Sequence, residues 1–200
     1  LLAHAFAHHG GHVICMTDGS ASHPNSVNWP PETLARQRHA ELETAVAHLG
    51  GDTTDITWLG LKDGGLHLYD AREIADQIVA TATRLRAATL FAPAQEDHHA
   101  DHKATAEIAS LVAAMRPDLT LYSYPVWSRW DEDDFASQIS AHDPVTCASD
   151  RFLPQKQSAV EAHGSQLGRI VDDDPTGFVM DPAFVEKFVR EDEIFWRSRP

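Results

Sequence analysis

The feature that most constrains the fold is a regular alternation of apolar runs with amphipathic stretches. Four runs are short, apolar and rich in strand-forming residues, at 12–16, 56–59, 88–92 and 119–124. Stretches with helical spacing lie between them, at 32–49, 70–86 and 104–115. Alternating strands and helices are typical of a mostly parallel sheet covered by helices on both faces. We therefore expect an α/β protein with a Rossmann-like fold.

Chain length and the weaker patterns at either end complete the expected organisation. The 200 residues suffice for one domain with its own core, so residues 1–200 are expected to form a single domain. Residues 1–9 have the pattern of the end of a helix, and residues 156–163 that of a short helix. The segment from Pro182 to Trp196 is expected to be a terminal helix.

Charge and cysteine content restrict the partners. The net charge of -14 repels phosphate backbones, which argues against nucleic acid as a partner. Cys15 and Cys147 lie far apart and form no closely spaced pair, which suits a reducing cytoplasm. No apolar run approaches the roughly 20 residues of a membrane span. These features predict a cytoplasmic protein and leave a homo-oligomer open.

Polar segments follow each of the first three predicted strands. In parallel α/β folds such segments meet at the carboxyl ends of the strands, where ligands bind. The third segment is the richest, because residues 96–102 read EDHHADH and hold three histidines and three carboxylates. His99 and His102 share one side of a helix that begins near Asp101, and Asp97 and Asp101 are placed to orient them.

Two interpretations of this cluster compete. A solvated acidic loop whose histidines titrate near neutrality is the usual meaning of two loop histidines. Imidazoles supported by carboxylates are also the ligand set that zinc prefers. The density of such residues at a strand end favours the metal site.

The cluster and several other segments resemble the PIG-L/LmbE family of zinc-dependent N-deacetylases. The cluster is similar to the family's second metal motif, a strand followed by D-x-H-x-D-H and a helix. The family's TDG turn corresponds to residues 17–19, its R-x-x-E-x-x-x-A helix to Arg38, Glu41 and Ala45, and its LG-x-x-D turn to residues 59–63. Late in the chain, Lys156 and then His163, Ser165 and Gln166 match a lysine followed by H-x-S-Q.

The resemblance implies an activity and a set of roles. The activity is removal of the acetyl group from an N-acetylglucosamine-type amino sugar or conjugate, with one zinc ion as cofactor. His102 would ligate the zinc, and a cationic His99, supported by Asp101, would stabilise the oxyanion or protonate the leaving amine. Substrate contacts would come from Asp18, Arg38, His163 and Gln166.

The sequence departs from the family pattern in two places. Ala100 replaces the proline of the usual H-P-D-H, which should loosen the turn slightly and spare the ligand. The family's first motif, His-Pro-Asp-Asp-Glu, supplies the other zinc ligands and the catalytic base and is absent here. Both the remaining ligands and the base are therefore expected upstream of Leu1.

Plainer explanations and other functions stay open at this point. Arg38 and Glu41 could form a simple i,i+3 ion pair, Asp18 an Asx turn, and His163 a favourable charge at a helix end. Trp29, Trp127 and Trp130 are weak candidates for stacking on a sugar. Asp97, His98 and His99 also resemble the DHH phosphoesterase motif. A non-catalytic sugar-binding relative without metal is the third possibility.

Overall fold

The chain forms two compact units. The computed structural model describes residues 1–131, 135–140 and 142–198. The first unit contains Leu1–Gly64 and Ala148–Asp192, and the second contains Gly65–Cys147 and Glu193–Pro200.

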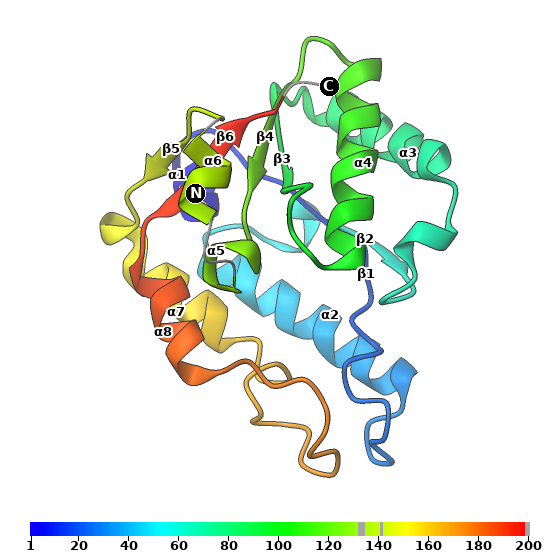
Figure 1. The fold of residues 1–200 in the computed structure, drawn as a ribbon. Helices are drawn as coiled ribbons and strands as arrows, with labels where there is room; N and C mark the ends of the chain where they lie inside the picture. The colour runs from blue at the N-terminus through cyan, green and yellow to red at the C-terminus, as the bar shows by residue number, and fades with distance from the viewer. Residues whose placement is uncertain (132–134, 141, 199–200) are drawn as a thin grey trace. The chain divides into compact units, whose positions relative to one another are not determined.

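The first unit is built on a pair of parallel strands and one long helix. Its elements are α1 (Leu2–His8), β1 (Val13–Thr17), α2 (Pro31–His48), η1 (Thr53–Asp55), β2 (Ile56–Leu61), η3 (Asp150–Phe152), α7 (Leu153–Glu161) and α8 (Pro182–Arg190). β1 pairs with β2 in parallel, with Val13 opposite Ile56. α2 packs against α7, and α7 packs against α8 (Figure 1). The α2 helix starts at Pro31, whose fixed φ suits a first helical position, and it buries Leu34 and Val46.

The second unit contains a four-stranded mixed sheet. Its elements are η2 (Leu66–Leu68), α3 (Ala71–Leu85), β3 (Thr89–Pro93), α4 (Ala100–Met115), β4 (Thr120–Tyr124), α5 (Ser128–Asp131), α6 (Phe135–Ser140), β5 (Val145–Cys147) and β6 (Glu193–Arg197). The strand order is β3-β4-β6-β5. β3 and β4 are parallel, whereas β6 is antiparallel to both β4 and β5.

The core of the second unit holds the parallel strand pair against α4. Ala92 on β3, Leu121 on β4 and Ala109 and Ala113 on α4 are all buried and in one cluster. The alanines have small side chains, which lets the helix backbone approach the sheet closely. α3 packs against α4 (Figure 1). This packing fixes where α4 begins, directly after the histidine-rich segment that follows β3.

The structure confirms the α/β class and the four predicted strands, although the sheets are small. The predicted helix from Pro182 to Trp196 is wrong in its second half. α8 ends at Arg190, the backbone of Glu191 is extended, and the chain continues as β6. β6 has two strand partners and buries Phe195 and Trp196, which outweighs the helical spacing of the apolar residues. Among the described residues, no helix has the length and apolar character to cross a membrane.

Candidate functional site

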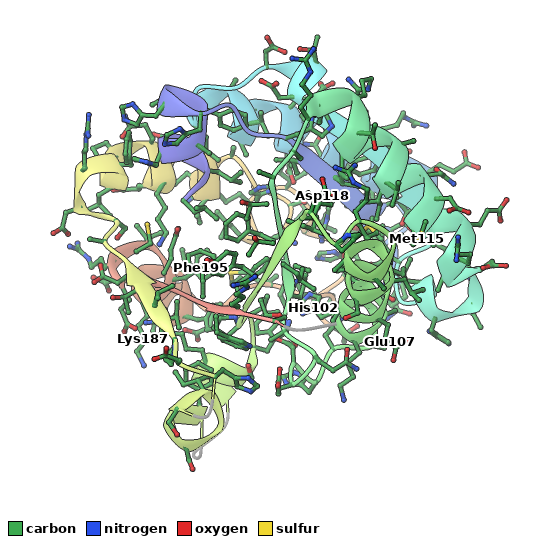
Figure 2. The ribbon with its side chains drawn as sticks, turned by 90° about the horizontal axis from the view of Figure 1, so that it is seen from above. His102, Glu107, Met115, Asp118, Lys187 and Phe195 are labelled. Atoms are coloured by element: carbon green, nitrogen blue, oxygen red, sulfur yellow. The ribbon has the colours of Figure 1, made fainter. Side chains whose placement is uncertain are left out.

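The predicted cluster lies in the second unit, between the end of β3 and the first turn of α4. The α4 helix begins at Ala100, four residues earlier than the sequence pattern indicated, because His99 caps it. The Asp101 backbone N–H donates to His99 Nδ1 at 3.2 Å. His102 projects from the first turn of this helix (Figure 2). The rings of His99 and His102 are adjacent, with centroids 4.6 Å apart.

Asp97 is the most deeply buried polar residue of this cluster, with no exposed side-chain surface. Its Oδ1 accepts hydrogen bonds from the His99 N–H at 3.2 Å and from His102 Nδ1 at 3.1 Å. Its Oδ2 accepts from the N–H groups of Val126 at 3.1 Å and Trp127 at 2.7 Å. Burial alone would raise the pKa of Asp97, but the bonds from His102, Trp127 and His99 outweigh burial and hold this pKa well below its usual range.

The two neighbouring imidazoles therefore offer different groups at Nε2, a lone pair on one ring and a proton on the other. An ionised carboxylate can only accept hydrogen bonds, so His102 must carry a proton on Nδ1, which leaves the lone pair of Nε2 bare in the neutral ring. His99 accepts on Nδ1, so its neutral ring carries the proton on Nε2. His102 thus offers a metal-ligating nitrogen, and His99 beside it offers a hydrogen-bond donor.

The role of Asp101 differs in detail from the expected one. Its carboxylate is buried and accepts a hydrogen bond from the Leu66 N–H at 3.1 Å. The described bond from Asp101 to His99 comes instead from the Asp101 backbone N–H. A cationic His99 would place an Nδ1 proton against that N–H. This bond differs from the carboxylate support that the sequence predicted, and the cationic state of His99 stays a prediction.

The first unit brings together Asp18, Arg38 and His163. Asp18 forms an Asx turn, because its Oδ1 accepts from the Ser20 N–H at 3.0 Å, and it also accepts from the Asp63 N–H at 3.2 Å. Gly19 has φ +67, and a Cβ there would lie 2.9 Å from Arg38 Cδ. The glycine therefore lets the Arg38 side chain lie against the turn.

Arg38 is largely enclosed and keeps one nitrogen without a hydrogen bond. Its Nη2 donates to Ser22 Oγ at 2.8 Å, whereas its Nε is buried without a hydrogen-bond partner in the described part of the chain. Burial lowers the pKa of Arg38, and the nearby Asp63 and Glu41 oppose this shift. Among the described ion pairs none joins Arg38 to Glu41, so the simple i,i+3 pair is not what the helix uses.

Glu41 instead joins α2 to the segment after α7. Its side chain is buried and accepts from the Ser165 N–H at 2.8 Å and from Ser165 Oγ at 2.7 Å. Gln37 Nε2 donates to the same carboxylate at 3.1 Å. Burial lowers the pKa of His163, with Glu41 opposing the shift and Arg38 adding to it. The R-x-x-E and H-x-S-Q segments thus meet through Glu41 and Ser165.

Gln166 and Lys156 are placed by contacts with neighbouring segments. The Gln166 N–H donates to the His163 carbonyl at 3.0 Å, and the Gln166 carbonyl accepts from Met180 at 2.8 Å. Lys156 Nζ donates to the Glu191 carbonyl at 3.3 Å and lies over the ring of Phe188. Lys156 therefore packs on α8.

Two loops of the first unit are clasped by a pair of aspartates. Asp173 accepts from Ser26 Oγ at 2.6 Å and from the N–H groups of Val27 and Asn28, both at 2.8 Å. Asp174 accepts from the Asn25 N–H at 2.9 Å. These bonds fix the segment before Trp29, whose side chain is partly buried. The side chain of Trp130 lies outside the described residues.

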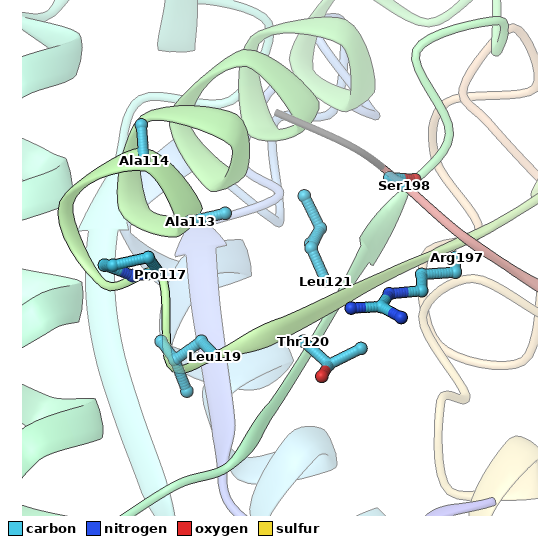
Figure 3. Close-up of a pocket in the computed structure, with 8 residues that line it drawn as sticks. All are labelled: Ala113, Ala114, Pro117, Leu119, Thr120, Leu121, Arg197 and Ser198. Carbon is cyan, nitrogen blue, oxygen red and sulfur yellow. The ribbon is translucent and has the colours of Figure 1, made fainter.

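One cavity of the second unit lies away from the histidines. It measures about 470 Å³ and lies at the amino end of β4, whereas His99 and His102 follow the carboxyl end of β3 (Figure 3). Figure 3 shows its lining residues, which include Ala113, Leu119, Leu121 and Arg197. We assign the site from the chemistry of the side chains rather than from cavity size.

The described residues were also compared with the needs of a metal. Within residues 1–131, 135–140 and 142–198, no group of three or more His, Cys, Asp and Glu side chains is arranged to hold an ion. His102 nevertheless fits the role of one zinc ligand. Its Nδ1 donates to the Asp97 carboxylate, and its Nε2 carries a lone pair. A complete site needs ligands beyond this one.

The fold and the motif around His99 and His102 agree with the family to which the chain compares. A family model described as PIG-L, GlcNAc-PI de-N-acetylase, matches residues 1–113, which is more than half of the chain. The chain belongs to the PIG-L family, as its motifs predicted. No curated protein matches it.

Solved structures share the fold at low sequence identity. The A40926 pseudoaglycone deacetylase is 19% identical, with a TM-score of 0.69 and coverage of 98% of this chain and 88% of that one. The N,N'-diacetylchitobiose deacetylase from Pyrococcus horikoshii is 18% identical, with a TM-score of 0.67 and coverage of 98% and 76%. The zinc-inhibited form of a teicoplanin deacetylase is 16% identical, with a TM-score of 0.65 and coverage of 98% and 91%.

Proposed function

We propose that this protein is a zinc-dependent hydrolase that removes the acetyl group from an N-acetylglucosamine-type amino sugar or conjugate. Membership of the PIG-L family and the deacetylase folds of the structural neighbours support the reaction class. The observation that carries the proposal is the pairing of a ligating nitrogen on His102 with a donating nitrogen on His99, in rings 4.6 Å apart.

His102 would supply one ligand of the metal site, and Asp97 would support it. Nε2 of His102 is the ligating atom, and the Asp97 carboxylate fixes the ring orientation. Zinc suits an imidazole ligand and, when bound, supplies Lewis acidity toward a carbonyl group and toward water. The teicoplanin deacetylase in its zinc-inhibited form supports a metal in proteins of this fold, and zinc is our proposal for the ion.

His99 would act on the acetyl group without changing its own charge. With Nδ1 occupied by the Asp101 N–H, the Nε2 proton of His99 is free to donate to the carbonyl oxygen of the acetamide as negative charge develops there. A ring that is already neutral is a poor acid for the leaving amine. We therefore propose oxyanion stabilisation as the role of His99, in preference to protonation of the amine.

Substrate contacts are proposed for the first unit's polar residues. The guanidinium of Arg38 has an unused buried Nε–H, and it suits sugar hydroxyls or a carboxylate. His163 and Gln166 are candidates beside it. The structural bonds of Asp18 favour a role in shaping the turn against which the Arg38 side chain lies. The cytoplasmic location and a homo-oligomer stay predictions.

The test is acetate release by the intact protein from N-acetylglucosamine and N,N'-diacetylchitobiose, after chelation and after zinc is restored. We expect activity only with metal. His102→Ala should lose both zinc binding and activity, whereas His99→Ala should keep zinc and lose about 100- to 1000-fold in kcat. His98→Ala, which changes an exposed histidine of the same loop, is the matched control and should leave both intact.

Other outcomes separate the alternatives. A fully active His102→Ala variant would contradict the assignment. Turnover of bis(p-nitrophenyl) phosphate, lost in His98→Ala, would indicate the phosphoesterase. Sugar binding without turnover at any metal concentration would indicate a non-catalytic relative.

A further inference from the structure

In the described part of the chain, the hydrogen bonds to the Asp97 carboxylate all come from groups that act as donors. Three are backbone N–H groups, from His99, Val126 and Trp127, which can never accept a hydrogen bond. The fourth is Nδ1 of His102, the only one of the four whose role can change, because a neutral imidazole has two tautomers. The occupied carboxylate therefore decides which nitrogen of His102 carries the proton.

The same side chain also joins two segments that follow neighbouring parallel strands. Its Oδ1 holds the segment after β3, and its Oδ2 holds the segment after β4 through two successive N–H groups. The second segment carries Trp127, whose ring lies 6.5 Å from that of His98. One fully buried carboxylate thus orients the candidate metal ligand His102 and also holds the backbone of Trp127, a candidate aromatic contact.

We propose that Asp97 is a positioning residue that keeps His102 in the Nδ1–H tautomer, so that Nε2 is ready for the metal, and that holds the 126–127 backbone beside it. This rests on the proposed function only in taking His102 as a ligand. A neutral amide does not fit this set of partners. An amide presents one donor nitrogen and one acceptor oxygen, whereas the four donors around Asp97 need two acceptor oxygens.

Asp97→Asn and Asp97→Ala separate the effect on the His102 tautomer from the effect on the 126–127 backbone. In Asp97→Asn, the amide oxygen should stay with Val126 and Trp127, because that side holds two backbone N–H groups. The other side holds one, that of His99, which loses its acceptor. The amide nitrogen then donates to His102 Nδ1 and forces the proton to Nε2, where it blocks the metal. Asp97→Ala removes both sets of bonds. The two variants therefore share the metal defect and differ at the 126–127 backbone.

The experiment measures three quantities in the intact protein. Zinc affinity, from competition with a chromogenic chelator, should fall about 10- to 100-fold in both variants. Imidazole nitrogen-15 shifts of metal-free protein should show His102 as Nδ1–H in the wild type and Nε2–H in Asp97→Asn. Amide exchange at Val126 and Trp127 should accelerate in Asp97→Ala and stay near wild type in Asp97→Asn. Glu96→Gln, the same kind of change one residue earlier, should alter none of them.

Wild-type zinc affinity in Asp97→Asn, or a wild-type His102 protonated on Nε2, would overturn the proposal. The second measurement needs no variant, so it decides the matter even where a substituted protein fails to fold. Neither readout requires turnover. A protein that shows the predicted tautomers and affinities but releases no acetate would contradict the proposed function and leave the role of Asp97 standing.

Discussion

Two buried carboxylates, Asp97 in the second unit and Glu41 in the first, solve the same problem in different ways. Both are almost fully removed from solvent, and both join segments that are separate in the sequence. Asp97 meets four groups that act as donors, whereas Glu41 meets a hydroxyl, Ser165 Oγ, that can donate or accept. An amide can therefore replace a buried carboxylate without other consequences only where the partner that reverses its role, such as Ser165 Oγ, has no further task. At Asp97 that partner is His102, whose tautomer would change.

The largest expected effect that tests this comparison is on the stability of Glu41 variants. Glu41→Ala leaves the buried Ser165 N–H and hydroxyl unsatisfied, so we expect a loss of about 2–4 kcal/mol in the free energy of unfolding. Glu41→Gln should lose about 1 kcal/mol, because the amide nitrogen can donate to Ser165 Oγ. Denaturant unfolding measures both.

Zinc affinity provides the contrast with Asp97. Both Glu41 variants should bind zinc as the wild type does, in the state that remains folded. Equal destabilisation by Ala and Gln at position 41 would show that charge, and not hydrogen-bond polarity, explains the difference between the two carboxylates.

A smaller effect on stability is expected at Gly19, against which the Arg38 side chain lies. Gly19→Ala combines a left-handed backbone with a contact of 2.9 Å to Arg38 Cδ, and we expect a loss of about 1–3 kcal/mol. Gly64→Ala is the matched control, because Gly64 has a similar φ of +74 with nothing within 4 Å of the added Cβ. Similar losses in the two variants would mean that Arg38 moves aside freely.

The smallest expected effect is the acid sensitivity of the Asp173–Asp174 clasp. Hydrogen bonds from Ser26 and Thr176 lower the pKa of Asp173 and Asp174, respectively. A lowered folded-state pKa stabilises the fold above the unfolded value of about 3.9, and this stability is lost as pH falls through the folded value. Denaturant unfolding at pH 5 and pH 3 should therefore show a smaller difference for Asp173→Asn than for the wild type. An unchanged difference would mean that the clasp does not titrate.

Local patterns predicted the elements of the fold well where a short segment determines its own structure. The strands before the loops and the helix after Asp70 follow from apolar runs and from a side chain that accepts from the Arg72 and Glu73 N–H groups. β6 was missed because its partners, β4 and β5, decide its conformation. Helical spacing in the sequence cannot reveal such pairing.

The sequence could indicate candidate residues for the site, but not the hydrogen bonds between them. Density of histidine and carboxylate was enough to single out His99 and His102. The role of Asp97 depends on Val126 and Trp127, about thirty residues later in the chain, and the bond from Glu41 to Ser165 spans 124 residues. These are tertiary contacts, so spacing within one motif carries no signal for them. The acceptor role of His99 Nδ1 likewise follows only from the direction of one N–H group.

The hydrogen bonds of His99 and His102 limit how this loop can change in length. The Asp101 N–H reaches back two residues to His99, and the Asp97 carboxylate reaches forward five residues to His102. One inserted residue between Asp97 and His99 would break the second spacing and leave the first unchanged. We therefore expect the segment to tolerate side-chain substitutions at His98 and Ala100 far better than any insertion or deletion.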